Sequence, residues 1–177
     1  MPSGRTHDAI TFLLAAPAAA VGYAVTNNAW ASCVVAVAFL FGGLMFGPDL
    51  DTVSKQYSRW SIFRVLWLPY RKFFKHRSRF THGLALGALI RTVYFMGVIT
   101  ISTYIIAFTW MEISNDTVPD VGDLRNAWLL VAYSMKKYLG DNFLFLSFAG
   151  MWFGGASHSI TDLVITYIKT GRVEKFL

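Results

Sequence analysis

Two long stretches without a charged residue, 9–25 and 31–46, constrain the fold of this chain more than any other feature. A third apolar stretch, 83–110, carries a single charge at Arg91, and a fourth, 143–168, becomes polar mainly in its second half. A helix that crosses a membrane needs about 20 mainly apolar residues. The pattern therefore predicts that each of these four stretches spans a membrane.

The composition favours the same class of protein. Of the 177 residues, 55% are hydrophobic and 15% are charged, whereas about 25% of the residues of a typical globular domain are charged. This composition argues against a disordered chain, a coiled coil and a disulfide-rich scaffold. Residues 124–139 predict one more helix, which lies in the interface, re-enters the membrane or spans it in part. We expect an all-α membrane protein in which residues 1–177 form one integral domain, a bundle of about four to five membrane helices.

Basic residues gather on one side of the expected spans. Twelve of the 16 Lys and Arg residues lie before the first span, between the second and third, or after the last. They are Arg5, Lys55, Arg59, Arg64, Arg71, Lys72, Lys75, Arg77, Arg79, Lys169, Arg172 and Lys175. The positive-inside rule places these segments, with the N-terminus, on the cytoplasmic side.

The segment 56–80 mixes aromatic and basic residues. Trp and Tyr favour the headgroup region, and each Lys or Arg near an anionic surface contributes about 1 kcal/mol of attraction. We therefore expect a basic interfacial segment with membrane lipids as its partners. Interleaved basic and aromatic residues also fit single-stranded nucleic acid. The membrane explains the same residues more simply, so we do not expect nucleic acid as a partner.

Histidines and aspartates recur at the expected cytoplasmic ends of the spans. The set consists of His7, Asp49, Asp51, His76, His82, His158 and Asp162. His158 and Asp162 are four residues apart, so a helix places them on one face. Taken singly, each residue is also typical of a helix end. Taken together, imidazole and carboxylate ligands suit Zn²⁺, Mn²⁺ or Fe²⁺, and seven ligands exceed what one tetrahedral site holds. The set predicts a cluster of two or three metal ions.

Four short motifs occur in a fixed order along the chain: Thr6-His7, Pro48-Asp49-Leu50-Asp51, His76-Arg77 followed by Thr81-His82, and His158 with Asp162. Together they resemble the YdjM-like family of membrane-bound metal-dependent hydrolases, and more closely a related group of cyanobacterial membrane proteins described as metal-binding. The interval from His76 to His82 is one residue longer than the usual family pattern. The resemblance covers nearly the whole chain and implies a bacterial inner or thylakoid membrane.

The resemblance also implies a chemistry. The family is distantly similar to zinc-dependent phospholipase C and single-strand nucleases, which are helical proteins with several zinc ions. It therefore implies a helical fold of that kind, zinc as the metal and a phosphodiester as the substrate. The matching positions are the seven histidines and aspartates of the set above. Asp49 or Asp51 would serve as the catalytic base, and Arg77 and Arg79 would steer the phosphate of the substrate.

Three functions fit these observations. The first is a membrane-embedded metal-dependent hydrolase of phosphoesters, with lipid headgroups as one substrate class. The second is a non-catalytic metal-binding scaffold or assembly partner of a membrane complex. The third is a small transporter, which the sequence disfavours because the polar residues gather at one membrane face. The sequence leaves the oligomeric state open.

Overall fold

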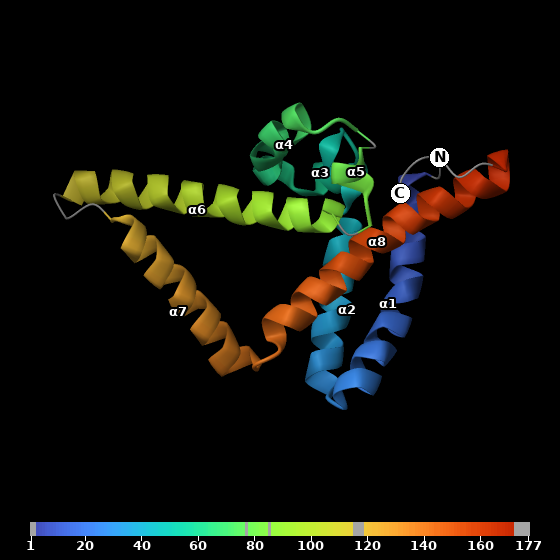
Figure 1. Cartoon of the computed structure of the whole chain (residues 1–177), viewed down its shortest axis with the longest axis horizontal. Coiled ribbons are helices and arrows are strands. Elements are labelled where there is room, and N and C mark those ends of the chain that lie inside the picture. Colours follow the sequence, from blue (N-terminus) through green and yellow to red (C-terminus); the bar gives the residue numbers. More distant parts are fainter. Residues whose placement is uncertain (1–2, 77, 85, 115–118, 172–177) are drawn as a thin grey trace. The chain divides into compact units, whose positions relative to one another are not determined.

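The computed structural model describes residues 3–76, 78–84, 86–114 and 119–171 (Figure 1). Every regular element in these ranges is a helix, so the expected all-α fold is confirmed. The chain forms two compact units. One consists of Met1–Arg91 with Phe145–Leu177, and the other is Thr92–Leu144. All seven predicted ligands belong to the first unit.

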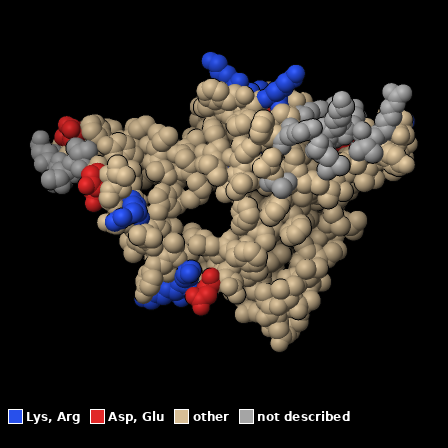
Figure 2. Space-filling model, viewed as in Figure 1, with Lys and Arg blue, Asp and Glu red and all other residues tan. Residues whose placement is uncertain are grey.

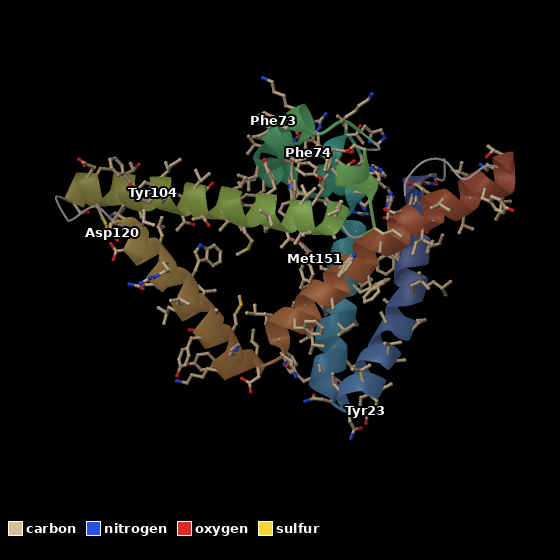
Figure 3. All side chains as sticks on the ribbon, viewed as in Figure 1. Tyr23, Phe73, Phe74, Tyr104, Asp120 and Met151 are labelled. Carbon is tan, nitrogen blue, oxygen red and sulfur yellow. The ribbon has the colours of Figure 1, made fainter. Side chains whose placement is uncertain are left out.

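Helices α1 (Gly4–Thr26) and α2 (Ala29–Leu44) form a hairpin. Asn27 adopts a left-handed conformation with φ 49°, which asparagine tolerates better than most residues and which ends α1. The side chain of Asn28 then caps α2 by accepting a hydrogen bond from the amide of Trp30 at 2.8 Å. Tyr23 lies close to this turn (Figure 3) and is half exposed, as is Trp30. Exposed aromatic side chains at the end of an apolar hairpin are typical of a membrane interface.

Three stretches are long and apolar enough to cross a membrane, namely Gly4–Thr26, Ala29–Asp51 and Leu86–Ser114. They correspond to the first three predicted spans, and the last contains α6 (Leu86–Ser114). On the side in view, the part of the α1–α2 hairpin near its turn shows no charged side chain (Figure 2). The number of four to five spans is not confirmed, because the two other long helices fall outside this group.

Those two helices are α7 (Val121–Leu139) and α8 (Phe143–Thr170). Helix α7 begins with a capping box between Asp120 and Asp123, and charged residues recur along it. Helix α8 corresponds to the fourth predicted span, but its second half carries His158 and Asp162, both buried. Its polar residues therefore face protein in the first unit.

Short helices follow α2 and cover its end. They are η1 (Pro48–Asp51), α3 (Lys55–Arg59), η2 (Ser61–Trp67), α4 (Leu68–Phe73) and α5 (Arg79–His82). Arg59 donates a hydrogen bond to the carbonyl of Leu44 at 2.7 Å, and the indole of Trp60 donates one to the carbonyl of Met45 at 2.8 Å. These bonds satisfy carbonyls that the last turn of a helix leaves without a partner.

Residues 56–80, predicted as a basic interfacial segment, are thus partly folded into a core. Trp67 and Tyr70 have no exposed surface. The ring of Trp67 packs edge-on against Phe46, with centroids 5.4 Å apart, and against Trp60, at 5.3 Å. Phe73 and Phe74, which end this run, lie at the end of α4 (Figure 3). The aromatic residues of the segment therefore pack the short helices against the end of α2.

Helix α8 crosses α2 at a contact between glycines. A Cβ atom added to Gly42 would collide with the carbonyl of Met151, and one added to Gly154 would collide with the carbonyl of Phe39. Small residues allow two helix backbones to approach this closely. The close crossing brings the second half of α8 next to α1 and η1.

Candidate metal centre

Three buried side chains from the two ends of the chain form a first group. His7 lies in the first turns of α1, and His158 and Asp162 lie one turn apart on α8. Nε2 of His7 is 3.2 Å from Oδ1 of Asp162, and Nε2 of His158 is 3.7 Å from Oδ2 of the same carboxylate. The two imidazole rings stack, with centroids 3.7 Å apart. One potential ligand atom from each residue lies within 4.8 Å of the others, close enough to share one ion.

A second group consists of Asp49, His76 and His82, whose potential ligand atoms also lie within 4.8 Å of one another. Asp49 comes from η1, His82 ends α5, and His76 lies in the loop before α5. The rings of His76 and His82 meet edge-on with centroids 5.2 Å apart. A turn between them, and not a shared helical face, brings these two histidines together.

Asp49 connects the two groups. Its Oδ1 lies 3.4 Å from Nε2 of His82, and its Oδ2 lies 3.3 Å from Nε2 of His158. The Asp49 side chain is 22% exposed, whereas that of Asp162 is 4% exposed. A carboxylate with one oxygen directed to each group is placed to bridge two ions.

Asp51 lies behind the second group and belongs to neither. Its Oδ1 accepts a hydrogen bond from Nδ1 of His76 at 2.7 Å, and its Oδ2 is 3.7 Å from Nδ1 of His82. Thr81 adds a contact of 3.0 Å from its hydroxyl to the same nitrogen of His82. Carboxylates in this position orient histidine ligands and fix which ring nitrogen faces a metal.

The buried polar atoms of the site fit a metal. Among the described residues, none makes a hydrogen bond of suitable geometry with Oδ1 of Asp49, with Nε2 of His158 or with either carboxylate oxygen of Asp162. A buried carboxylate without hydrogen bonds costs several kcal/mol unless a cation compensates it. Imidazole nitrogens and carboxylate oxygens are the ligands that Zn²⁺, Mn²⁺ and Fe²⁺ take. The donor set and its unsatisfied atoms therefore match a metal centre.

Gln56 is a site residue that the sequence analysis missed. Its Oε1 accepts a hydrogen bond from the amide of Asp49 at 3.1 Å, and its Nε2 donates one to the carbonyl of Gly43 at 2.7 Å. The same Nε2 lies 3.2 Å from Nδ1 of His158. Gln56 thus ties η1, α2 and α8 together at the first group. No motif singles it out, because it is one polar residue in a basic, aromatic segment.

Arg91 is the second such residue. The structure shows its side chain 3% exposed, with Nη1 donating a hydrogen bond to the carbonyl of Thr81 at 2.6 Å. Arg91 therefore holds the backbone just before His82.

A small cavity of about 30 Å³ opens beside the first group. Its lining includes His7, Asp49 and His158, together with Gln56 and Lys55. This volume is sufficient for a water molecule. Lys55 also pairs with Asp8 at 2.6 Å and is half exposed, so a cation stands at the edge of the cavity.

Two predicted phosphate-binding residues are not placed. Arg77 lies outside the described residues, and so does the side chain of Arg79, whose backbone begins α5. All seven predicted ligands are described. The structure brings six of them into the two groups and sets Asp51 behind His76 and His82.

Comparison with known proteins agrees with a metal-binding chain. No curated protein and no solved structure matches it. The model of one family, described as uncharacterized metal-binding protein (DUF2227), matches residues 2–172, a range that contains every residue of both groups. The chain therefore belongs to the DUF2227 family of metal-binding proteins.

Proposed function

We propose that this protein is a membrane-embedded, metal-dependent hydrolase of phosphoesters whose metal centre faces the cytoplasm. The observation that carries the proposal is the position of Asp49, with one carboxylate oxygen at 3.3 Å from His158 and the other at 3.4 Å from His82. Two ions held by the two groups would share this carboxylate. Enzymes that cleave phosphoesters commonly use two such ions about 3.5–4 Å apart.

The first ion would be held by His7, His158 and Asp162, and the second by His76 and His82, with Asp49 between them. When bound, zinc (or manganese or iron) would polarise the phosphoryl oxygens and lower the pKa of water. We assign Asp51 to orientation of His76 and His82, because it already accepts a hydrogen bond from His76 at 2.7 Å. This leaves Asp49 as the base, which would accept the proton on a lone pair of a carboxylate oxygen that is not bound to an ion.

Asp49 suits that role because it is the most exposed carboxylate of the site and lines the small cavity. Asp51 does not suit the role of base, because its side chain has no exposed surface. A water molecule in the cavity would give its proton to Asp49 while its oxygen forms a bond to phosphorus. The bond from phosphorus to the leaving oxygen would break, and that oxygen would take a proton from solvent. Hydrolysis would yield a phosphomonoester and an alcohol.

Cations near the cavity would bind the phosphate of the substrate. Lys55 lines the cavity and keeps half of its side chain exposed. Arg77 and Arg79, which the sequence predicts for this role, come shortly before His82 in the sequence and remain proposed. Arginine can bind a phosphate with two hydrogen bonds, whereas lysine supplies a point charge.

The three long apolar helices support a membrane location, and the basic residues predict which side faces the cytoplasm. The site lies at the beginning of α1 and just after α2, at one end of the hairpin. We propose that this end lies at the inner leaflet of a bacterial inner or thylakoid membrane. A phosphate ester of a lipid headgroup would then be within reach.

A non-catalytic metal-binding scaffold is the second candidate. The first group favours it, because His7, His158 and Asp162 are all buried, and structural metal sites are closed. The second group is more open, with the His76 side chain 40% exposed. Catalytic metal sites keep such an open position for substrate.

The full chain, purified in mild detergent without chelator, would be analysed for metal content by mass spectrometry. It would then be assayed for cleavage of bis(p-nitrophenyl) phosphate and of phospholipid vesicles. We expect bound metal and turnover in the wild type, loss of turnover in Asp49→Asn, and wild-type behaviour in Asp141→Asn, a matched change in an exposed turn. Metal without turnover would favour the scaffold, and absence of metal would overturn both proposals.

A further inference from the structure

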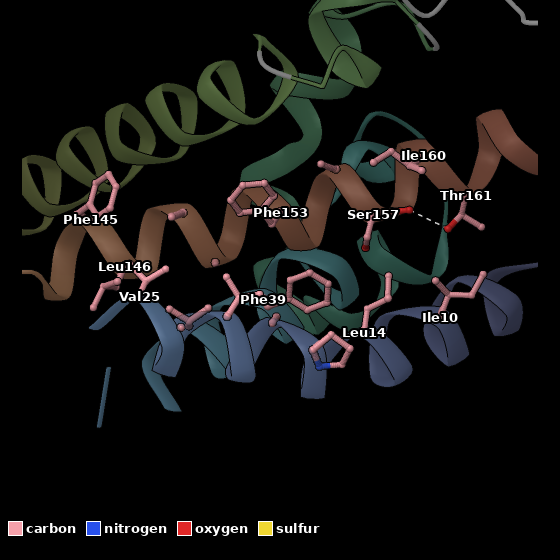
Figure 4. Close-up of a pocket in the computed structure, with 18 of the residues that line it drawn as sticks. Ile10, Leu14, Val25, Phe39, Phe145, Leu146, Phe153, Ser157, Ile160 and Thr161 are labelled. Atoms are coloured by element: carbon pink, nitrogen blue, oxygen red, sulfur yellow. Dashed lines mark hydrogen bonds between the residues drawn. The ribbon is translucent and has the colours of Figure 1, made fainter. Parts of the chain in front are cut away.

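A large apolar groove lies between α1 and α8, with α2 at its base (Figure 4). Its volume is about 700 Å³, within the usual range of ligand-binding pockets. At one end it is lined by Ile10 and Thr161, and at the other by Val25 and Leu146. The described lining residues include no charged side chain.

The few polar residues of the lining do not make the groove polar. The hydroxyl of Thr161 donates to the carbonyl of Ser157 at 2.8 Å, a bond drawn in Figure 4. The hydroxyl of Ser157 donates to the carbonyl of Gly154 at 2.7 Å, and that of Thr26 donates to Gly22 at 2.7 Å. Each hydroxyl is satisfied within its own helix, so the groove offers its ligand only apolar contacts.

The groove passes close to the first group: its lining begins at Ile10 on α1, three residues after His7, and on α8 it continues past Asp162 to Ile165. Ile10 and Leu14 line it, and they follow His7 on the same face of α1 at spacings of three and seven residues. On α8, Thr161 lines the groove and precedes Asp162. An apolar chain in this groove would therefore lie along α1 and reach within about one helical turn of His7. That arrangement fits an amphiphile.

We propose that the groove binds an acyl chain of a membrane phospholipid and so presents the phosphodiester of its headgroup to the metal centre. From Ile10 to Val25 the groove follows 15 residues of α1, about 22 Å at 1.5 Å per residue. The hydrocarbon of one leaflet is about 15 Å thick. The groove is thus long enough for the acyl chain of one leaflet. This inference rests on the proposed function and names its substrate class.

Native mass spectrometry of the full chain in mild detergent tests it, with dipalmitoyl phosphatidylglycerol as the probe and dipalmitoylglycerol, which lacks phosphate, as the comparison. We expect the wild type to retain one phosphatidylglycerol per chain and to retain dipalmitoylglycerol about tenfold less well. Ala18→Trp fills the groove and should reduce retention of phosphatidylglycerol by about tenfold or more. Ala20→Trp, an exposed position outside the lining, is the matched control and should retain the lipid.

Metal content reports whether each variant folds. If the Ala18→Trp variant loses its metal, the test uses Val21→Gln instead, because Val21 also lines the groove. Its control is Leu13→Gln, because Leu13 is exposed and does not line the groove. Equal retention in groove and control variants would overturn the proposal, and so would a wild type that retains no lipid. A wild-type dimer that Ala18→Trp dissociates would assign the groove to a second copy instead. Turnover of bis(p-nitrophenyl) phosphate is a separate readout, so it can persist when lipid binding fails.

Discussion

Oδ2 of Asp49 lies 3.3 Å from Nε2 of His158, a residue 109 positions further along the chain and in the other group of potential metal ligands. This contact makes the two groups one centre. Asp49 reaches it because η1 turns sharply after α2, and His158 reaches it because α8 crosses α2 at glycines. The chemistry of the site therefore depends on the packing of α8, which carries two of the potential ligands, against α2, which carries none.

If Asp49 is shared, its replacement should affect two ions. We expect Asp49→Asn to lower the metal content of the purified chain from two ions to one or none, because the amide lacks the charge that two cations share. Asp8→Asn is a nearby control, since Asp8 pairs with Lys55 and Arg59 and belongs to neither group. A metal content that stays at two ions in Asp49→Asn would show that the groups bind independently.

Asp51 should behave differently from Asp162, although both are buried aspartates. Asp51→Asn removes an orienting carboxylate, so we expect a loss of about 10–100-fold in zinc affinity with the site still formed. Asp162→Asn removes a ligand, so the first ion should be lost. Competition titration with a fluorescent zinc chelator separates the two outcomes. Equal losses in the two variants would make Asp51 a ligand, as the sequence alone predicts.

The sequence could single out the histidines and aspartates that the structure brings together, because imidazole and carboxylate side chains in short motifs are typical of metal ligands. His158 and Asp162 also have a spacing that a helix fixes directly. Gln56 and Arg91 were not predictable, because their roles arise from tertiary contacts with the carbonyls of Gly43 and Thr81. The long apolar helices follow from hydropathy. The burial of Trp67 does not follow from hydropathy, because an aromatic residue in a basic segment suits both a membrane interface and a folded core.

Arg91 provides a test of that buried contact. Arg91→Met removes the donor to the carbonyl of Thr81 and leaves a buried acceptor unsatisfied, which costs about 1–3 kcal/mol. We expect a lower thermal midpoint in detergent and weaker metal binding at the second group. Arg91→Lys should recover part of the stability, because a cation remains. Arg125→Met, on the exposed surface of α7, is the control and should leave both quantities unchanged.

Because α8 contacts α2 at glycines, one added methyl group should lower the stability of the chain at Gly154 but not at Gly97. Gly154→Ala should destabilise the chain by about 1–3 kcal/mol, because its Cβ would meet the carbonyl of Phe39 and the helices would have to move apart. Gly97→Ala is the matched control in α6, where a Cβ meets nothing within 4 Å. It should be neutral or stabilise the helix by up to about 1 kcal/mol. Chemical unfolding in detergent measures both, and equal effects would contradict the close crossing.

Metal removal should destabilise the first unit, because the buried carboxylate of Asp162 would lose the cation that compensates it. A ligand present at about 100 times its dissociation constant adds roughly 2.7 kcal/mol to folding stability. We therefore expect EDTA to lower the thermal midpoint of the wild type, followed by tryptophan fluorescence, and added zinc to restore it. His158→Ala should unfold at a lower temperature than the wild type and respond weakly to either treatment, because His158 belongs to the first group and contacts the shared carboxylate. A wild-type midpoint that EDTA leaves unchanged would mean that the buried carboxylates are compensated without a metal ion.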